Sequence, residues 1–197
     1  MTKEEITKIL ESNNFSLREI FSYKTQEGFN LWHLCAKQKD SLLFNKICAL
    51  FSSEQIKEKL NEKNELGDSP AHLAAWVENK EVLKTIVKYN TNLDYLDSQN
   101  RNIAMIVIKI KPKDKELINY TLEHTKQINQ QDNQKRTILH YAQHFSDPEI
   151  YEKIISLGCN LNIKSRFGEK PKSPHVEFTE SILDFVNKNT IIKKRLI

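Results

Sequence analysis

Glycine is scarce in this chain of 197 residues, which contains only four. The glycines stand at positions 28, 67, 158 and 168, and no two of them are closer than ten residues. Phosphate-binding loops such as GxGxxG and GxxxxGK[ST] need clustered glycines where the backbone approaches the ligand. The spacing excludes both nucleotide-binding motifs. Five prolines and few alternating β-branched residues also argue against an all-β sandwich or barrel.

Cysteine and long apolar runs are also rare. The three cysteines, Cys35, Cys48 and Cys159, are widely separated and form no CxxC pair, which favours free thiols in a reducing compartment. The first residues, MTKEEI, are charged and include no apolar segment of a secretion signal. The longest nearly apolar run, 103–110, is far shorter than the roughly 20 residues that a bilayer span requires. We therefore expect a soluble intracellular protein without a membrane partner, in the cytoplasm of its own cell or of a host.

Charge and catalytic motifs are equally limited. The 30 basic and 26 acidic residues leave a net charge of +4, which is low for a dedicated nucleic-acid binder. The sequence has no HExxH motif, nucleophile elbow or paired-carboxylate motif, so we expect no catalytic residues, no metal and no cofactor. His140 and His144 have the spacing of two metal ligands on one helix face, but no third ligand lies near them.

A repeated pattern is the most informative feature of the chain. The segments NLWHLCA from position 30, SPAHLAA from position 69 and TILHYAQ from position 137 align with one another, and a weaker copy, NIAMIVI, begins at position 102. Their central residues, His33, His72, Met105 and His140, are separated by 39, 33 and 35 residues. A second column, which begins with Leu60-Asn61, repeats at intervals of 33, 35 and 33 residues. Independent columns with one spacing indicate tandem structural repeats.

These segments resemble the ankyrin repeat, which has a period of about 33 residues and the signature T-P-L-H-x-A. The resemblance covers about residues 25–171 and is clearest in the second and fourth repeats. It implies an all-α ankyrin-repeat solenoid of about four helix-turn-helix units with hairpin loops, capped by terminal helices. The expected boundaries are 1–24 for the N-terminal capping helices, 25–63, 64–96, 97–131 and 132–164 for the repeats, and 165–197 for a partial repeat, a capping helix and a basic tail.

Several positions depart from the family pattern. Asn100 and Lys135 replace the glycine expected at the hairpin tip, where Asn tolerates a left-handed backbone and Lys does so poorly. Additional residues around 52–57 and 111–115 are interpreted as lengthened loops. The resemblance gives the repeat histidines a structural role, in which they hold the turn to the helix by hydrogen bonds.

The resemblance also implies where a partner binds, because the family uses its variable hairpin tips and the ends of the first helices as a concave recognition face. The residues of this chain expected there are Phe29, Leu66, Asp68, Trp76, Val77, Arg101, Lys109, Ile110, Arg136, His144 and Phe145. Aromatic residues beside arginines are typical of interface hot spots, and Trp76 is the strongest single candidate. In the alternative interpretation, some of these side chains, Val77 and Ile110 especially, pack against adjacent turns.

The leading hypothesis is a non-enzymatic adaptor that binds another protein through this face. The partner is expected to present an apolar surface with acidic groups opposite Arg101 and Arg136. One alternative is a basic repeat protein that docks on nucleic acid, in which case affinity would fall steeply with salt. A second alternative is a host-targeting effector of an intracellular bacterium, which the Lys-, Ile- and Asn-rich composition would fit.

Overall fold

In the computed structural model, the described residues are 4, 6–8, 16–38, 40–89, 93–110, 114–143 and 148–172. All regular secondary structure in these ranges is helical, which confirms the all-α prediction. In chain order the helices are α2 (Leu17–Ser22), α3 (Leu31–Lys37), α4 (Ser41–Cys48), α5 (Ser53–Asn61), α6 (Pro70–Trp76), α7 (Lys80–Tyr89), α8 (Ile103–Ile110), α9 (Lys115–Glu123), α10 (Ile138–Ala142) and α11 (Pro148–Ser156). None of them is long and apolar enough to cross a membrane.

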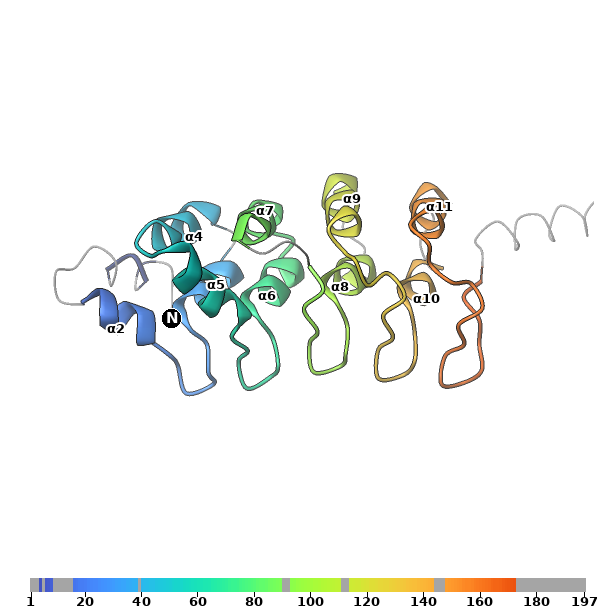
Figure 1. Ribbon diagram of the computed structural model, residues 1–197, viewed down its shortest axis with the longest axis horizontal. Coiled ribbons are helices and arrows are strands. Elements are labelled where there is room, and N and C mark those ends of the chain that lie inside the picture. The colour runs from blue at the N-terminus through green and yellow to red at the C-terminus, as the bar shows by residue number, and fades with distance from the viewer. Residues whose placement is uncertain are drawn as a thin grey trace, which may run out of the picture.

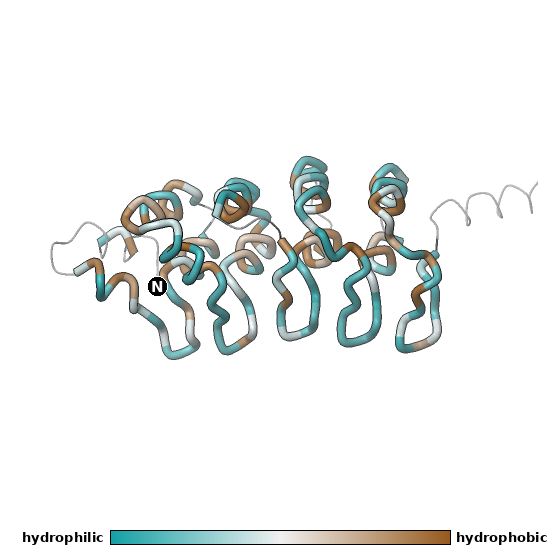
Figure 2. Tube along the Cα trace, in the orientation of Figure 1, coloured by the Kyte–Doolittle hydropathy of each residue, from teal (hydrophilic) through white to brown (hydrophobic). Residues whose placement is uncertain are grey.

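The helices stack in two layers (Figure 1). The inner helices α3, α6, α8 and α10 pack against one another in chain order, and each is followed by an outer helix, α4, α7, α9 or α11. Long hairpin loops precede the inner helices and project in a row from the same side (Figure 1). These loops are mainly hydrophilic, whereas apolar residues gather in the helices (Figure 2). The architecture is a solenoid in which each repeat packs on its neighbours.

Small and apolar side chains let the inner helices approach closely. Ala74 and Ala75 of α6 are fully buried, and α8 has a run of buried residues from Ile103 to Ile108. Because α8 contacts α6, α9 and α10, its first turns have little surface left for solvent. Each fully buried Leu, Ile or Val contributes about 1.5–3 kcal/mol. The seams between repeats are therefore the main source of stability.

Three histidines, His33, His72 and His140, tie the inner helices to the hairpins. In each ring Nδ1 accepts a hydrogen bond from the backbone N–H three residues earlier, at 2.9–3.3 Å. This leaves Nε2–H to donate to a backbone carbonyl of the next repeat or hairpin, at 3.0–3.2 Å. The predicted structural role is confirmed. In the third repeat Met105 cannot make this link, and Asn102 instead donates from Nδ2 to the carbonyl of Gln127 at 3.2 Å.

The hairpin tips require a left-handed backbone. The residues with positive φ at the five tips are Gly28, Gly67, Asn100, Lys135 and Gly168. Asn100 and Lys135, both at φ 58°, confirm the substitutions that the sequence predicted at this position. A Cβ atom at position 67 would stand 3.1 Å from the backbone nitrogen of Ser98, so the absence of a side chain there also permits close packing of adjacent hairpins.

The first repeat corrects one prediction. The additional residues around 52–57 do not form a lengthened loop, because Ser53–Asn61 is the helix α5. Ser52 forms a capping box with Gln55, and the apolar positions Ile56 and Leu60 are buried. The spacing of two apolar residues four apart after a Ser-x-x-Gln start was the overlooked helix signal.

The ends of the solenoid match the expected caps only in part. Ile6 and Ile20, one from each predicted N-terminal helix, are buried in the core. Residues 165–172 form a fifth hairpin, in which the Ser165 N–H donates to the carbonyl of Glu169 at 2.8 Å. The predicted closing helix and basic tail, within 173–197, lie outside the described residues, as do His144 and Phe145.

Candidate protein-binding surface

Two predicted site residues from neighbouring repeats meet on the hairpin side of the inner helices. Trp76 is the last residue of α6, and Arg101 ends the hairpin that leads into α8. The guanidinium carbon of Arg101 lies 5.2 Å from the centre of the Trp76 ring. The indole is 37% exposed, which is unusual for a tryptophan in a protein with this much buried apolar surface. The ring is therefore both accessible and held in place by a cation.

Lys109 is the second cation at this indole. It occupies the position in α8 that Trp76 occupies in α6, and its Nζ lies 5.8 Å from the centre of the ring. Partial burial lowers the pKa of Lys109, and the charges of Arg101 and Arg136 lower it further. In the described part of the chain, no carboxylate lies within ion-pair distance of its ammonium group.

Arg101 is not exposed as the sequence-based hypothesis expected. Its relative exposure is only 5%, and its Nε donates to Oδ2 of Asp97 at 2.7 Å. The other carboxylate oxygen of Asp97 accepts the backbone N–H groups of Gln99 and Arg101, both at 2.9 Å. The same carboxylate thus shapes the turn and holds the arginine four residues later. Arg101 therefore does not offer an exposed donor fork to a partner, because its side chain is buried and two of its nitrogens contact Asp97.

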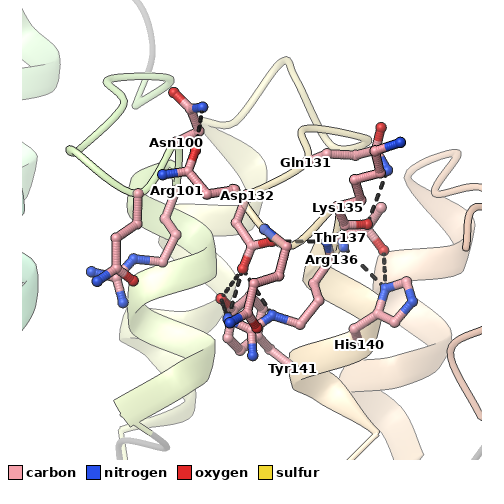
Figure 3. Close-up of polar contacts among 12 residues, drawn as sticks. Asn100, Arg101, Gln131, Asp132, Lys135, Arg136, Thr137, His140 and Tyr141 are labelled. Atoms are coloured by element: carbon pink, nitrogen blue, oxygen red, sulfur yellow. Dashed lines mark hydrogen bonds and ion pairs between the residues drawn. The ribbon is translucent and has the colours of Figure 1, made fainter. Parts of the chain in front are cut away.

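The next hairpin repeats this arrangement with more exposure (Figure 3). Arg136 donates from Nε to Oδ2 of Asp132 at 2.8 Å and from Nη2 to the hydroxyl oxygen of Tyr141 at 2.8 Å. The Tyr141 hydroxyl donates in turn to Asp132 at 2.6 Å, and burial together with this carboxylate raises the pKa of Tyr141. The side chain of Arg136 is 34% exposed and lies over the Tyr141 ring, 4.8 Å from its centre. Arg136 therefore retains a solvent-facing side.

Sequence reasoning did not identify Asp97, Asp132 and Tyr141 as part of this surface. An available signal was the Asp-x-x-x-Arg spacing, which occurs in both hairpins and brings the two side chains together across the turn. We call the five contiguous side chains Trp76, Arg101, Lys109, Arg136 and Tyr141 the Trp76 surface.

The other predicted site residues lie around this cluster. Leu66, at a hairpin tip, is 63% exposed, whereas Asp68 is half-buried and its pKa is raised by burial and by the charge of Asp97. Val77 and Ile110 are partly buried, as the packing alternative expected. Phe29 is also partly buried and lies edge-on to His33, 5.9 Å between ring centres.

One exposed apolar residue was missed. Phe167 is 74% exposed and directly precedes Gly168 at the tip of the fifth hairpin, the same position that Leu66 takes before Gly67. The repeated apolar-Gly pair was the sequence signal for it.

Burial shifts the pKa values of several cysteines and histidines. Within the described ranges, no three His, Cys, Asp or Glu side chains gather as a metal site. Burial raises the pKa of the Cys35 thiol to about 12 and those of Cys48 and Cys159 to about 11, so these thiols stay protonated at neutral pH. Burial also lowers the pKa of His33 and His72 to about 4 and keeps both rings neutral.

Comparison with known proteins identifies the class to which this architecture corresponds. Residues 71–165 match the family described as ankyrin repeats in three copies. The chain therefore carries ankyrin repeats, and its described part is an ankyrin-repeat solenoid. Ankyrin repeats are in general modules of protein–protein interaction rather than catalytic domains.

One relative is an ankyrin repeat protein of Acanthamoeba polyphaga mimivirus, 30% identical over 105 residues. The match covers 53% of this chain and 13% of that relative, so the chain spans only a small part of the viral protein's length. The similarity is thus a similarity of repeats.

Proposed function

We propose that this protein is a non-enzymatic adaptor that binds another protein through its hairpin-side face, with Trp76 at the centre of the contact. The exposed indole of Trp76 carries this proposal, because a large aromatic side chain held by two cations on an otherwise well-buried helix is the composition of an interface hot spot. Lys109 and the open side of Arg136 add donors beside it, which favours a partner with apolar and acidic groups.

The pairing of the arginines argues against nucleic acid as the main ligand. Arg101 and Arg136 each share a carboxylate within their own hairpin, so a phosphate backbone would meet Asp97 and Asp132 together with the cations. Phosphate binding draws its affinity from unpaired Lys and Arg and the counterions they release. An adaptor that works inside a host cell would use the same protein-binding face, and it differs from the leading proposal only in where the partner resides.

Site-specific photo-crosslinking tests the proposed face. A benzophenone amino acid is placed at position 76 and, as a matched control, at position 88, an exposed residue of the outer helix α7. We expect crosslinks to a distinct protein from position 76 and none to that protein from position 88. Equal crosslinking from both positions, or crosslinks from position 88 alone, would contradict the proposal that the partner binds the hairpin-side face.

A further inference from the structure

Lys109 differs from the two arginines of the Trp76 surface in having no ion pair among the described residues. Arg101 pairs with Asp97 and Arg136 pairs with Asp132, each within one hairpin. Lys109 lies among these four groups, and of the described carboxylates none is its own partner. Lys109 is thus the cation of this cluster that forms no ion pair with a described carboxylate.

The ammonium group of Lys109 stands beside the exposed indole of Trp76. Lys109 and Arg101 approach the same indole, at 5.8 and 5.2 Å from its centre. The Nη1 group of Arg101 is buried and has no hydrogen-bond partner among the described residues, although the other guanidinium nitrogens hold Asp97. Because this group and its side chain are buried, the exposed Lys109 is the cation that an anion next to Trp76 can reach.

The number of carboxylates nearby limits the charge of that anion. Asp97 and Asp132 stand among the cations, and burial together with the charge of Asp97 raises the pKa of Asp68. These three carboxylates repel a phosphate dianion more strongly than a single carboxylate, which the one ammonium group of Lys109 can hold. The apolar face of Trp76 then provides a contact for a side chain next to the acidic residue.

We infer that the Trp76 surface binds an acidic segment of a partner protein, with one Asp or Glu carboxylate on Lys109 and an apolar side chain against Trp76. This inference deepens the proposed function and rests on it. The carboxylate accepts a charge-assisted hydrogen bond from the Lys109 ammonium group.

Quenching of tryptophan fluorescence tests the charge at the indole without a partner. Trp76 is accessible, and the fully buried Trp32 provides the unquenched reference within the same molecule. At constant low ionic strength, we expect Lys109→Gln to reduce quenching of the accessible fraction by iodide by about twofold, since one charge near 6 Å changes the local anion concentration by that order. Acrylamide, which is neutral, should quench the variant and the wild type equally. Lys88→Gln on α7 is the matched control and should leave iodide quenching unchanged, whereas equal iodide quenching of Lys109→Gln and the wild type would contradict the inference.

Selection from a random dodecapeptide library tests the ligand chemistry. Peptides selected on the wild-type protein should be enriched in Asp or Glu adjacent to Leu, Phe or Trp, and their Kd should rise about tenfold in Lys109→Gln but not in Lys88→Gln. Enrichment of basic peptides, or tighter binding of a phosphoserine peptide than of its Glu counterpart, would overturn the inference. Binding that depends on Trp76 but not on Lys109 would refute the carboxylate site and leave the adaptor proposal intact. Peptides that bind independently of both residues would contradict both.

Discussion

The two sides of the solenoid use charge in different ways. On the outer helices, ion pairs join neighbouring repeats and stay open to water: Lys80 contacts Glu116 at 2.6 Å, and Lys153 contacts Glu123 at 2.8 Å. On the hairpin side, Asp97 and Asp132 are buried and pair within their own turns. Exposed pairs contribute about 0–1 kcal/mol each, whereas breaking a buried pair costs several times more. The outer side adds small, salt-sensitive contributions, and the hairpin side fixes the shape of the surface that we assign to binding.

The largest loss of stability is expected at acidic pH. Acid should act first on the inner helices, which contain the buried histidines. His33 and His72 are buried as neutral rings, and burial lowers the pKa of each from the ordinary 6.5 to about 4. As the pH falls below 6.5, the unfolded state binds protons that the folded state does not, so stability is complete above pH 6.5 and is lost below it. Between pH 6.5 and 4.5 the loss should be about 2 kcal/mol for each histidine.

Urea denaturation at a series of pH values measures this loss. The exposed outer-face pairs should not contribute in this window, because the pairing with Lys80 lowers the pKa of Glu116 below its ordinary value of 4.5. A His72→Gln variant should be less stable at pH 7 and should lose about half as much stability on acidification as the wild type. A wild-type stability that is flat from pH 7 to 4.5 would contradict the assignment of neutral buried rings.

Breaking a hairpin-side ion pair should have the next largest effect. Asp97→Asn keeps an oxygen that can accept the turn N–H groups, as Asn64 does in the preceding hairpin, but it leaves the buried Arg101 without a counter-charge. We expect a loss of about 3–5 kcal/mol in the free energy of unfolding, measured by urea denaturation. Asp132→Asn should cost less, because Arg136 is partly exposed and solvent can compensate its charge. Equal and small losses in both variants would mean that the two hairpin pairs behave like exposed ones.

The smallest effect is expected on the outer side. Glu116→Gln removes the contacts of Glu116 with Lys80 and Lys84, at 2.6 and 3.5 Å, all of which are open to solvent. The loss should be about 0.2–1 kcal/mol at low salt and should disappear as the salt concentration approaches 1 M. Thermal melts of the variant and the wild type at both salt concentrations measure it. A loss above about 2 kcal/mol in the free energy of unfolding would contradict the claim that outer-side ion pairs contribute less than hairpin-side ones.

Much of this fold was predictable because the ankyrin pattern recurs at nearly constant intervals along the sequence. The repeated histidine column set the register, and the resemblance to the ankyrin repeat then implied the inner helices, the left-handed tips at Asn100 and Lys135 and the structural role of the histidines. The helix α5 was missed because it interrupts the repeat, and a comparison of repeats treats any insertion as a loop.

The proposed binding surface was predictable only in part. Register brought Trp76, Arg101 and Lys109 together correctly, since equivalent positions of adjacent repeats stack. The partners of the arginines were missed, because pairing depends on side-chain conformations within a turn that repeat spacing does not specify. Because Arg101 is buried, we assign the cation that meets a partner to Lys109 instead of Arg101.

The most direct test of the central claim is a paired measurement of affinity and melting temperature on Trp76→Ala, with the partner that position 76 crosslinks. The account predicts a rise in Kd of about thirtyfold, or roughly 2 kcal/mol, with little change in melting temperature, because the indole is 37% exposed and lies outside the buried core cluster. Leu42→Ala, which truncates a 64% exposed residue of the outer helix α4, is the control and should change neither quantity. An unchanged Kd in Trp76→Ala, or a collapse of stability by the roughly 3–5 kcal/mol typical of a core tryptophan, would contradict the account.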